Sequence, residues 1–141
     1  MREEELIALA DGARAHAYAP YSGFSVGAAL LCGDGTVFLG SNVENASYPV
    51  TCCAERSALV AAVSAGKRAF RAIAVMGGKT GEAPHRFCTP CGICRQALAE
   101  FCRADFPVYL SDGRETRCYP LGELLPASFS ADAMADGEGT V

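Results

Sequence analysis

Two short stretches of the chain concentrate side chains that can bind a metal ion. Residues 51–56 are TCCAER, and residues 88–94 are CTPCGIC. Cys91 and Cys94 form a C-x-x-C pair, and because helical positions three apart lie on one face, both sulfurs can contact one ion. In a protein whose cysteines stay reduced, such clusters indicate metal binding or catalysis before disulfides. We therefore expect one metal site built from both stretches.

Each stretch leads into a predicted helix, and this changes the chemistry of its thiols. Cys53 begins a helix predicted over 53–65, and Cys91 begins one predicted over 91–103. The free N–H groups and the positive dipole end of a helix N-terminus favour thiolate, the form that binds zinc. Three protein ligands with one open position are typical of catalytic zinc, whereas structural zinc takes four. The residues alone do not decide between Cys52 and Cys53 as the third ligand.

Glu55 gives the open position a chemical purpose. Residues two apart on a helix do not face the same point, so Glu55 is poorly placed to be the fourth ligand beside Cys53. A carboxylate next to a metal-bound water can instead accept its proton and pass it to a leaving group. The alternative is a closed structural zinc site with Cys52 or Cys88 as fourth ligand. That arrangement leaves Glu55 without a role.

The spacing of Cys88, Cys91 and Cys94 also overlaps the cysteine run of ferredoxin-type iron–sulfur proteins. The next cysteine of that run should come three residues on and precede a proline. Residues 95–98 are RQAL, and Cys102 comes too late. The spacing therefore favours zinc over an iron–sulfur cluster.

Composition limits the partners of this chain. Its 141 residues are 50% hydrophobic and 20% charged, which indicates one globular domain over 1–141 with a looser tail after about residue 130. The net charge is −4 and no run of Lys or Arg occurs, so we expect no nucleic-acid partner. No apolar run approaches the roughly 20 residues that span a bilayer, and the acidic N-terminus has no signal-peptide core. We expect a cytoplasmic protein without a membrane partner.

Hydrophobic patterning predicts an α/β layered sheet. Helical patterns cover residues 3–17, 53–65 and 91–103, with a short helical turn over 121–125. Strand patterns cover residues 24–32, 36–42, 71–78, 106–112 and 115–120. Gly66 is placed to end the second helix, and Pro90 comes just before the third. Strands that alternate with helices after a first hairpin favour a layered sheet over an all-β fold or a helical bundle.

The two cysteine stretches match a signature of zinc deaminases, in which a ligand, one residue and Glu are followed later by Pro-Cys-x-x-Cys. Here the signature is Cys53-Ala54-Glu55 followed by Pro90-Cys91-Gly92-Ile93-Cys94. Other shared segments are YAPYSGFSVGAAL (18–30), GSNVENASY (40–48), CCAERSAL (52–59), TPCGICRQ (89–96) and LLPASF (124–129). From about residue 3 to residue 130, the chain closely resembles the small homotetrameric, zinc-dependent cytidine deaminases.

This resemblance implies a fold, a cofactor and an activity. The fold is a three-layer α/β/α sandwich with a mixed five-stranded sheet. One Zn²⁺ per subunit is bound by Cys53, Cys91 and Cys94, and Cys52 has no metal role. The reaction is the hydrolytic deamination of cytidine and 2′-deoxycytidine to uridine and 2′-deoxyuridine with release of ammonia, in pyrimidine salvage. Glu55 carries the protons from the attacking water to the base and to the leaving group.

Arg56 has an electrostatic role in this interpretation. Three thiolates on Zn²⁺ give a site of net charge −1, which is poor at acidifying water. An arginine that donates hydrogen bonds to the ligand sulfurs withdraws charge and restores Lewis acidity, and the resemblance supports this role for Arg56. The backbone around Ala54 and Cys91 is expected to hold the edge of the base.

The resemblance also implies how the nucleoside is bound. Phe24 lies against the pyrimidine ring, and the side chains of Asn42 and Glu44 hydrogen-bond the ribose 3′-hydroxyl. Tyr48 and Phe129 reach into the site of a neighbouring subunit, which implies a homotetramer with shared active sites. No cluster of Lys or Arg accompanies the loop NVEN (42–45), and Glu44 in this loop repels a 3′-phosphate. We therefore expect a nucleoside substrate rather than a nucleotide.

Two other functions remain open at this point. A related deaminase could act on a modified cytosine nucleoside such as blasticidin S, although NVEN (42–45) and LLPASF (124–129) favour cytidine. In a different class, the protein is a binding module stabilised by zinc or an iron–sulfur cluster, without catalysis. In that case, replacement of Glu55 by Gln leaves the binding activity of the protein intact.

Overall fold

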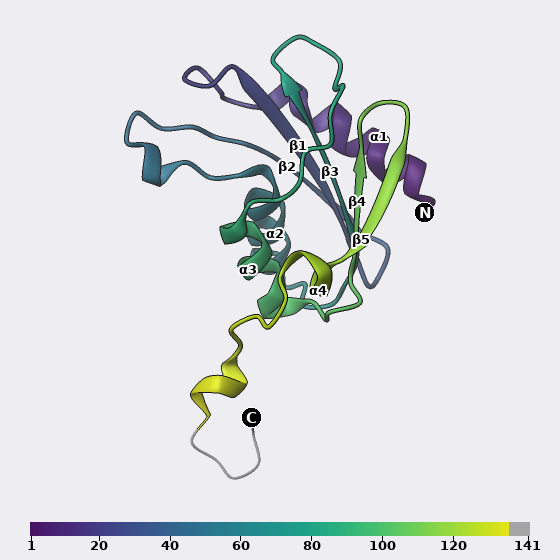
Figure 1. The fold of residues 1–141 in the computed structure, drawn as a ribbon, viewed down its shortest axis with the longest axis vertical. Helices are drawn as coiled ribbons and strands as arrows, with labels where there is room; N and C mark the ends of the chain where they lie inside the picture. Colours follow the sequence, from purple (N-terminus) through teal and green to yellow (C-terminus); the bar gives the residue numbers. More distant parts are fainter. Residues whose placement is uncertain (136–141) are drawn as a thin grey trace.

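Five strands form one mixed sheet in the computed structural model, which describes residues 1–135 of the chain (Figure 1). In chain order they are β1 (Phe24–Cys32), β2 (Val37–Ser41), β3 (Phe70–Lys79), β4 (Pro107–Ser111) and β5 (Thr116–Pro120). Their order across the sheet is β2-β1-β3-β4-β5. Neighbouring strands pair antiparallel except β3 and β4, which are parallel. The expected mixed sheet is therefore confirmed.

The pairing of β1 gathers several chain ends at one edge of the sheet. β1 is antiparallel to both of its neighbours, so it begins where β2 and β3 end. Phe24 pairs with Lys79, and Gly27 pairs with Ser41. The segments that lead from β2 and β3 into the two cysteine-bearing helices therefore leave from the edge at which Phe24 lies.

Helices cover both faces of the sheet and make three layers (Figure 1). The α-helices are α1 (Glu3–Ala13), α2 (Ala54–Ser64), α3 (Gly92–Phe101) and the short α4 (Leu121–Leu124). On one face, Leu6 and Ala10 of α1 pack against Ala29 and Ala74. On the opposite face, α2 and α3 lie over a second cluster of buried side chains. This confirms the α/β/α sandwich.

β1 is buried on both faces, which explains why its sequence is a nearly continuous apolar run. Ala28 and Leu30 point into the core beneath α2, whereas Ala29 and Leu31 belong to the core beneath α1. Successive side chains of a strand point to opposite faces, so one strand supplies both layers.

Gly40 lets α2 approach β2 closely. A Cβ atom at this position would lie 2.2 Å from the carbonyl oxygen of Ala54 and 2.5 Å from the amide nitrogen of Ala58. Both atoms belong to the first turns of α2, the part of the helix that follows Cys53. Because Gly40 has no side chain, the start of α2 can lie this close to the sheet.

The structure confirms the order and type of the predicted elements and adjusts their ends. The first helix ends at Ala13, earlier than the predicted residue 17, and a 3₁₀ helix covers Arg14–His16. Gly66 follows α2 with a φ of +91°, as a helix-ending glycine requires. In the predicted tail, a 3₁₀ helix covers Ala131–Met134, and residues 136–141 lie outside the described part of the chain. Among residues 1–135, no helix combines the length and hydrophobicity needed to cross a membrane.

Replacement of Gly40 by Ala tests the close approach of α2. The added methyl group must push the helix backbone away from β2, so we expect the free energy of unfolding to fall by about 1–3 kcal/mol. Urea unfolding followed by circular dichroism measures the change. Gly12→Ala is the matched control, since Gly12 lies inside α1 with no atom within 4 Å of an added Cβ, and it should stabilise the protein by about 0.5–1 kcal/mol. Equal stability of Gly40→Ala and the unmodified protein would contradict the packing argument.

Candidate functional site

Three cysteine sulfurs meet between the starts of α2 and α3. The Sγ atoms of Cys53, Cys91 and Cys94 all lie within 4.8 Å of one another. The Cys53–Cys91 distance is 3.8 Å, and the Cys91–Cys94 distance is 3.5 Å. A tetrahedral zinc ion with Zn–S bonds of about 2.3 Å separates its sulfur ligands by about 3.8 Å. The three side chains are therefore positioned to bind one metal ion.

The helix ends explain why these thiols are available. Cys53 is the N-cap residue of α2 and Cys91 the N-cap residue of α3, and neither side chain caps a backbone N–H of its own helix. Cys94 lies one turn further into α3 and is fully buried. Helix N-termini stabilise negative charge, so both helices favour thiolates at the point where they meet.

In the absence of a metal ion, hydrogen bonding within the cluster shifts the pKa values of Cys53 and Cys94 in opposite directions. Interaction with the Cys94 thiol, with help from the Arg56 guanidinium, lowers the pKa of Cys53. The same interaction with Cys53, together with burial, raises the pKa of Cys94. Cys53 therefore loses its proton more readily than Cys94, whose proton must leave when a metal ion binds.

Cys52 and Cys88 stay outside this cluster, which is the only such group of three or more metal-binding side chains among residues 1–135. The Cys52 thiol instead faces the backbone oxygen of Cys53 at 3.6 Å. Cys88 packs over Gly77, where an added Cβ would lie 2.7 Å from its sulfur, and burial raises its pKa to about 12. The structure thus supports neither a closed four-cysteine site nor a cluster ligated through Cys88.

Arg56 connects the sulfur cluster to the surrounding backbone. Its Nη2 atom donates to the carbonyl oxygen of Thr51 at 3.2 Å and to Cys53 Sγ at 3.6 Å. Its Nε atom is buried and has no hydrogen-bond partner within the described chain. A buried donor left over beside several thiols fits a site that carries additional negative charge when a metal ion has drawn off their protons.

Glu55 lies beside the cluster rather than in it. Its side chain is 4% exposed in the first turn of α2, and its carboxylate is not a member of the metal-binding group. Burial, followed by the negative charge of the Cys53 thiolate, raises the pKa of Glu55 to about 7. A bound divalent cation would act in the opposite direction and favour the carboxylate. Burial thus favours the neutral acid and a bound cation favours the carboxylate, and a group between these opposing effects can take up and release a proton.

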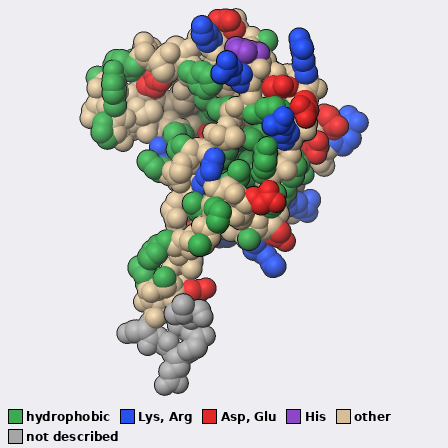
Figure 2. Space-filling model, viewed as in Figure 1, with side chains coloured by type: hydrophobic (Ala, Val, Ile, Leu, Met, Phe, Trp, Pro, Cys, Tyr) green, Lys and Arg blue, Asp and Glu red, His purple; other side chains and the backbone are tan. Residues whose placement is uncertain are grey.

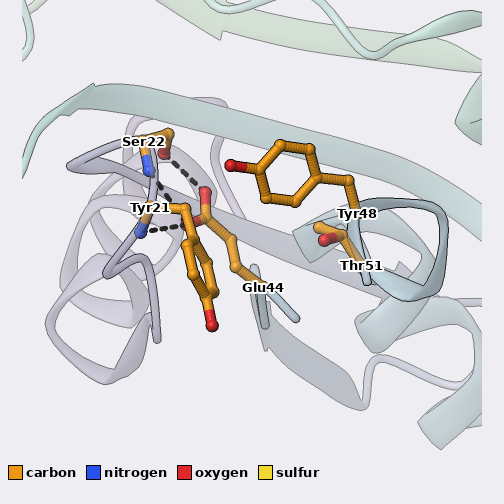
Figure 3. A pocket seen from close by; sticks show the side chains of 5 residues that line it. All are labelled: Tyr21, Ser22, Glu44, Tyr48 and Thr51. Carbon is orange, nitrogen blue, oxygen red and sulfur yellow. Dashed lines mark hydrogen bonds between the residues drawn. The ribbon is translucent and has the colours of Figure 1, made fainter. Parts of the chain in front are cut away.

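A pocket of about 280 Å³ opens around Glu44 (Figure 3), and Thr51 in its wall lies two residues before Cys53. Its lining residues are Tyr21, Ser22, Glu44, Tyr48 and Thr51. The Glu44 carboxylate accepts hydrogen bonds from the backbone N–H groups of Tyr21 at 2.9 Å and Ser22 at 3.1 Å, and from the Ser22 hydroxyl. The rings of Tyr21 and Tyr48 meet edge to face with their centroids 5.7 Å apart. An aromatic pocket with one carboxylate suits a small ligand that carries hydroxyl groups.

Three of these lining residues had no role predicted from the sequence. Tyr21 and Ser22 lie in the YAPYSGF segment that supported the resemblance, which was the available signal. No sequence signal pointed to Thr51, because its place in the pocket follows from the path of the loop. Its carbonyl oxygen binds Arg56, so one wall of the pocket is tied to the sulfur cluster.

Asn42 ties the loop that carries Glu44 to the sheet. Its side chain is only 8% exposed, accepts a hydrogen bond from the Val26 amide at 2.8 Å and donates one to the Phe24 carbonyl at 2.9 Å. Phe24 itself is partly exposed at the start of β1. These bonds leave one amide proton of Asn42 for a ligand and bring Phe24 to the same edge as Glu44. The backbones of the residues expected to bind base and sugar are therefore joined, although Phe24 lines a different cavity from Glu44.

The remaining predicted residues lie at different depths. Ala54, the first residue of α2, is completely buried. Tyr48 and Phe129 are 69% and 59% exposed, and Phe129 is not among the residues that line the pocket. Figure 2 shows hydrophobic side chains gathered over the loop that contains the 3₁₀ helix Tyr48–Val50 and over the tail after α4.

Comparisons with known proteins agree with this geometry. Residues 1–110 match the family model for the cytidine and deoxycytidylate deaminase zinc-binding region. A cytidine deaminase of Sporosarcina psychrophila is 47% identical over 139 residues, covering 96% of each chain. A cytidine deaminase of Halalkalibacterium halodurans is 48% identical over 137 residues, covering 96% of this chain and all of the relative.

Solved structures show the same likeness. The crystal structure of cytidine deaminase from Burkholderia pseudomallei has a TM-score of 0.84 and 47% identity, covering 92% of this chain and all of that one. The enzyme from Mycobacterium tuberculosis has a TM-score of 0.76 and 39% identity, covering 92% of this chain and 98% of that one. On the family match, the relatives and the three-thiol centre, this chain belongs to the zinc-dependent cytidine deaminase family.

Proposed function

We propose that this protein hydrolyses cytidine and 2′-deoxycytidine to uridine and 2′-deoxyuridine, consuming one water and releasing one ammonia per turnover. One observation carries the proposal: the Glu55 carboxylate is buried beside a cluster of three thiols that could hold a metal ion, and among residues 1–135 this cluster has no fourth metal-binding side chain. A deaminase needs this combination, because a water must be activated and a proton carried within one enclosed site.

Cys53, Cys91 and Cys94 would hold one Zn²⁺ per chain. When bound, Zn²⁺ lowers the pKa of a coordinated water toward neutrality. Glu55 accepts a proton from the attacking water and delivers it to N3 of the base. The water oxygen adds to C4, and Glu55 then passes the second proton of that oxygen to the amino group, which leaves C4 as ammonia. Arg56, through its contact with Cys53 Sγ, offsets part of the negative charge of the three thiolates.

The pocket around Glu44 would bind the nucleoside. The Phe24 ring lies against the pyrimidine, and the backbone around Ala54 holds the edge of the base. The free amide proton of Asn42 and the carboxylate of Glu44 bind the ribose 3′-hydroxyl. Support comes from the hydrogen bonds that join Asn42 to the Phe24 carbonyl and Ser22 to both Glu44 and the Phe24 amide.

The proposal extends to assembly and cellular role. Two strongly exposed aromatic side chains, Tyr48 and Phe129, suit contacts with other copies of the chain in a homotetramer with shared active sites. The chain would act as one domain over residues 1–141, in the cytoplasm, in pyrimidine salvage.

Replacement of Glu55 by Gln tests the proton carrier. Glutamine has nearly the same shape but cannot accept and return a proton, so we expect kcat for cytidine to fall by at least about a hundredfold. The loss of ultraviolet absorbance of cytidine measures the rate, and zinc content should stay at one ion per chain. Glu123→Gln, at an exposed position on α4, should keep full activity. Wild-type rates in Glu55→Gln would exclude this role and favour a non-catalytic module.

Replacement of Cys91 by Ala tests the metal centre. With one of three ligands removed, we expect zinc measured by atomic emission to drop well below one ion per chain and deaminase activity to disappear. Cys118→Ala, at an exposed thiol on β5, should retain both zinc and activity. Removal of zinc from the unmodified protein with a chelator should abolish turnover, and added Zn²⁺ should restore it. Full activity of the chelated, zinc-free protein would contradict the proposal.

The charge of Glu44 should discriminate against a phosphate at the sugar. We expect kcat/KM for cytidine 3′-phosphate to be at least about tenfold lower than for cytidine, since like charges meet and the hydroxyl donor is lost. In Glu44→Gln the difference between the two substrates should narrow. Comparable turnover of both by the unmodified enzyme would show that Glu44 does not face the 3′ position.

A further inference from the structure

The hydroxyl of Ser22 lies between two residues to which base and sugar binding are assigned. It donates a hydrogen bond to Glu44 Oε2 and accepts one from the backbone N–H of Phe24 at 3.0 Å. Figure 3 shows Ser22 and the Glu44 carboxylate facing each other, with the Tyr48 ring across the pocket. One side chain thus joins the carboxylate of the pocket to the residue that begins β1.

These two hydrogen bonds fix the direction in which the Ser22 hydroxyl donates its proton. A serine hydroxyl has a single proton, and an ionised carboxylate can only accept. Because Phe24 N–H occupies an acceptor position of the Ser22 oxygen, the proton is directed to Glu44. The bond from Ser22 is also the main reason why the pKa of Glu44 is lowered, which keeps it ionised.

Glu44 then has little acceptor capacity to spare. A carboxylate offers about four lone-pair positions. Tyr21 N–H and Ser22 N–H fill two of them at Oε1, and the Ser22 hydroxyl fills one at Oε2. The remaining position is on Oε2, and it suits one hydrogen-bond donor from a ligand in the pocket.

We propose that Ser22 is a positioning residue whose hydroxyl orients Oε2 of Glu44 toward the 3′-hydroxyl of the nucleoside, so that Ser22 sets the preference for substrates that carry this group. The inference rests on the proposed function and assigns to Ser22 a part in sugar selection.

If Ser22 had a purely structural role, its removal would affect all substrates equally. Ser22 is exposed in the turn before β1 and packs in neither core cluster. Water can replace its hydrogen bonds to Glu44 and Phe24 in the free protein, so its removal should change stability little. Water does not fix the direction in which Oε2 accepts, and only a substrate with a 3′-hydroxyl should detect that loss.

The experiment compares two nucleosides that differ only in this hydroxyl, 2′-deoxycytidine and 2′,3′-dideoxycytidine. In Ser22→Ala, we expect kcat/KM for 2′-deoxycytidine to fall about tenfold, as for loss of a charge-assisted hydrogen bond, and kcat/KM for 2′,3′-dideoxycytidine to change less than about twofold. Ser22→Thr keeps the hydroxyl and should restore the selectivity. Ser64→Ala, at the exposed end of α2, is the matched control and should behave as the unmodified enzyme.

Equal losses on both nucleosides in Ser22→Ala would overturn the inference, as would a Ser22→Thr enzyme with the selectivity of Ser22→Ala. In a Glu44→Ala background, Ser22→Ala should have little further effect, because the two residues act as a unit. Additive losses would show that Ser22 acts independently of Glu44. Failure of the unmodified, zinc-loaded enzyme to turn over either nucleoside would overturn the proposed function itself, and this is seen before any variant is compared.

Discussion

Three thiol sulfurs that become negatively charged on metal binding must lie within 4.8 Å of one another, and the rest of the site depends on this constraint. Like charges at this distance repel, so the surroundings have to favour them. Two helix N-termini meet at the cluster, and the Arg56 guanidinium contacts Cys53. The buried Nε of Arg56 adds a further donor that has no other partner in the described structure. Positive potential from backbone and side chain thus makes a three-thiolate centre tolerable.

The sheet brings the two helices to that point. β1 runs antiparallel to β2 and β3, so the connections that follow these two strands leave from one edge. Both connections turn back over the same face, where α2 and α3 pack against a common core. Gly40 allows α2 to sit low on β2, and the first turn of that helix carries Glu55. The same edge holds Phe24, which explains how metal chemistry and base binding come to share one place.

The pocket around Glu44 is held together by different interactions from those that form the metal centre. The metal centre extends from the buried Cys94 to the exposed Cys91 and is formed by two helix starts, whereas the pocket wall consists of partly exposed loops held by hydrogen bonds to backbone atoms. Asn42 joins its loop to β1, Glu44 joins the same loop to the turn before β1, and Arg56 joins the far wall to the cysteines. Asn42 keeps one amide proton free, and the Glu44 carboxylate keeps one acceptor position free. This pairing suits a hydroxyl group, which is both donor and acceptor.

Local sequence patterns determined most of the elements and the chemistry they bring. Periodicity placed the strands and helices to within a few residues, and the spacing of Cys53, Glu55, Cys91 and Cys94 at two helix starts indicated a catalytic zinc site. Tertiary structure decided which thiols meet: Cys53 turns to the cluster, while Cys52 and Cys88 do not. It also placed Ser22 between Glu44 and Phe24, and Asn42 against β1. Periodicity reports the face on which a side chain lies, but contacts between segments far apart in sequence are set by how layers pack, and no local pattern records them.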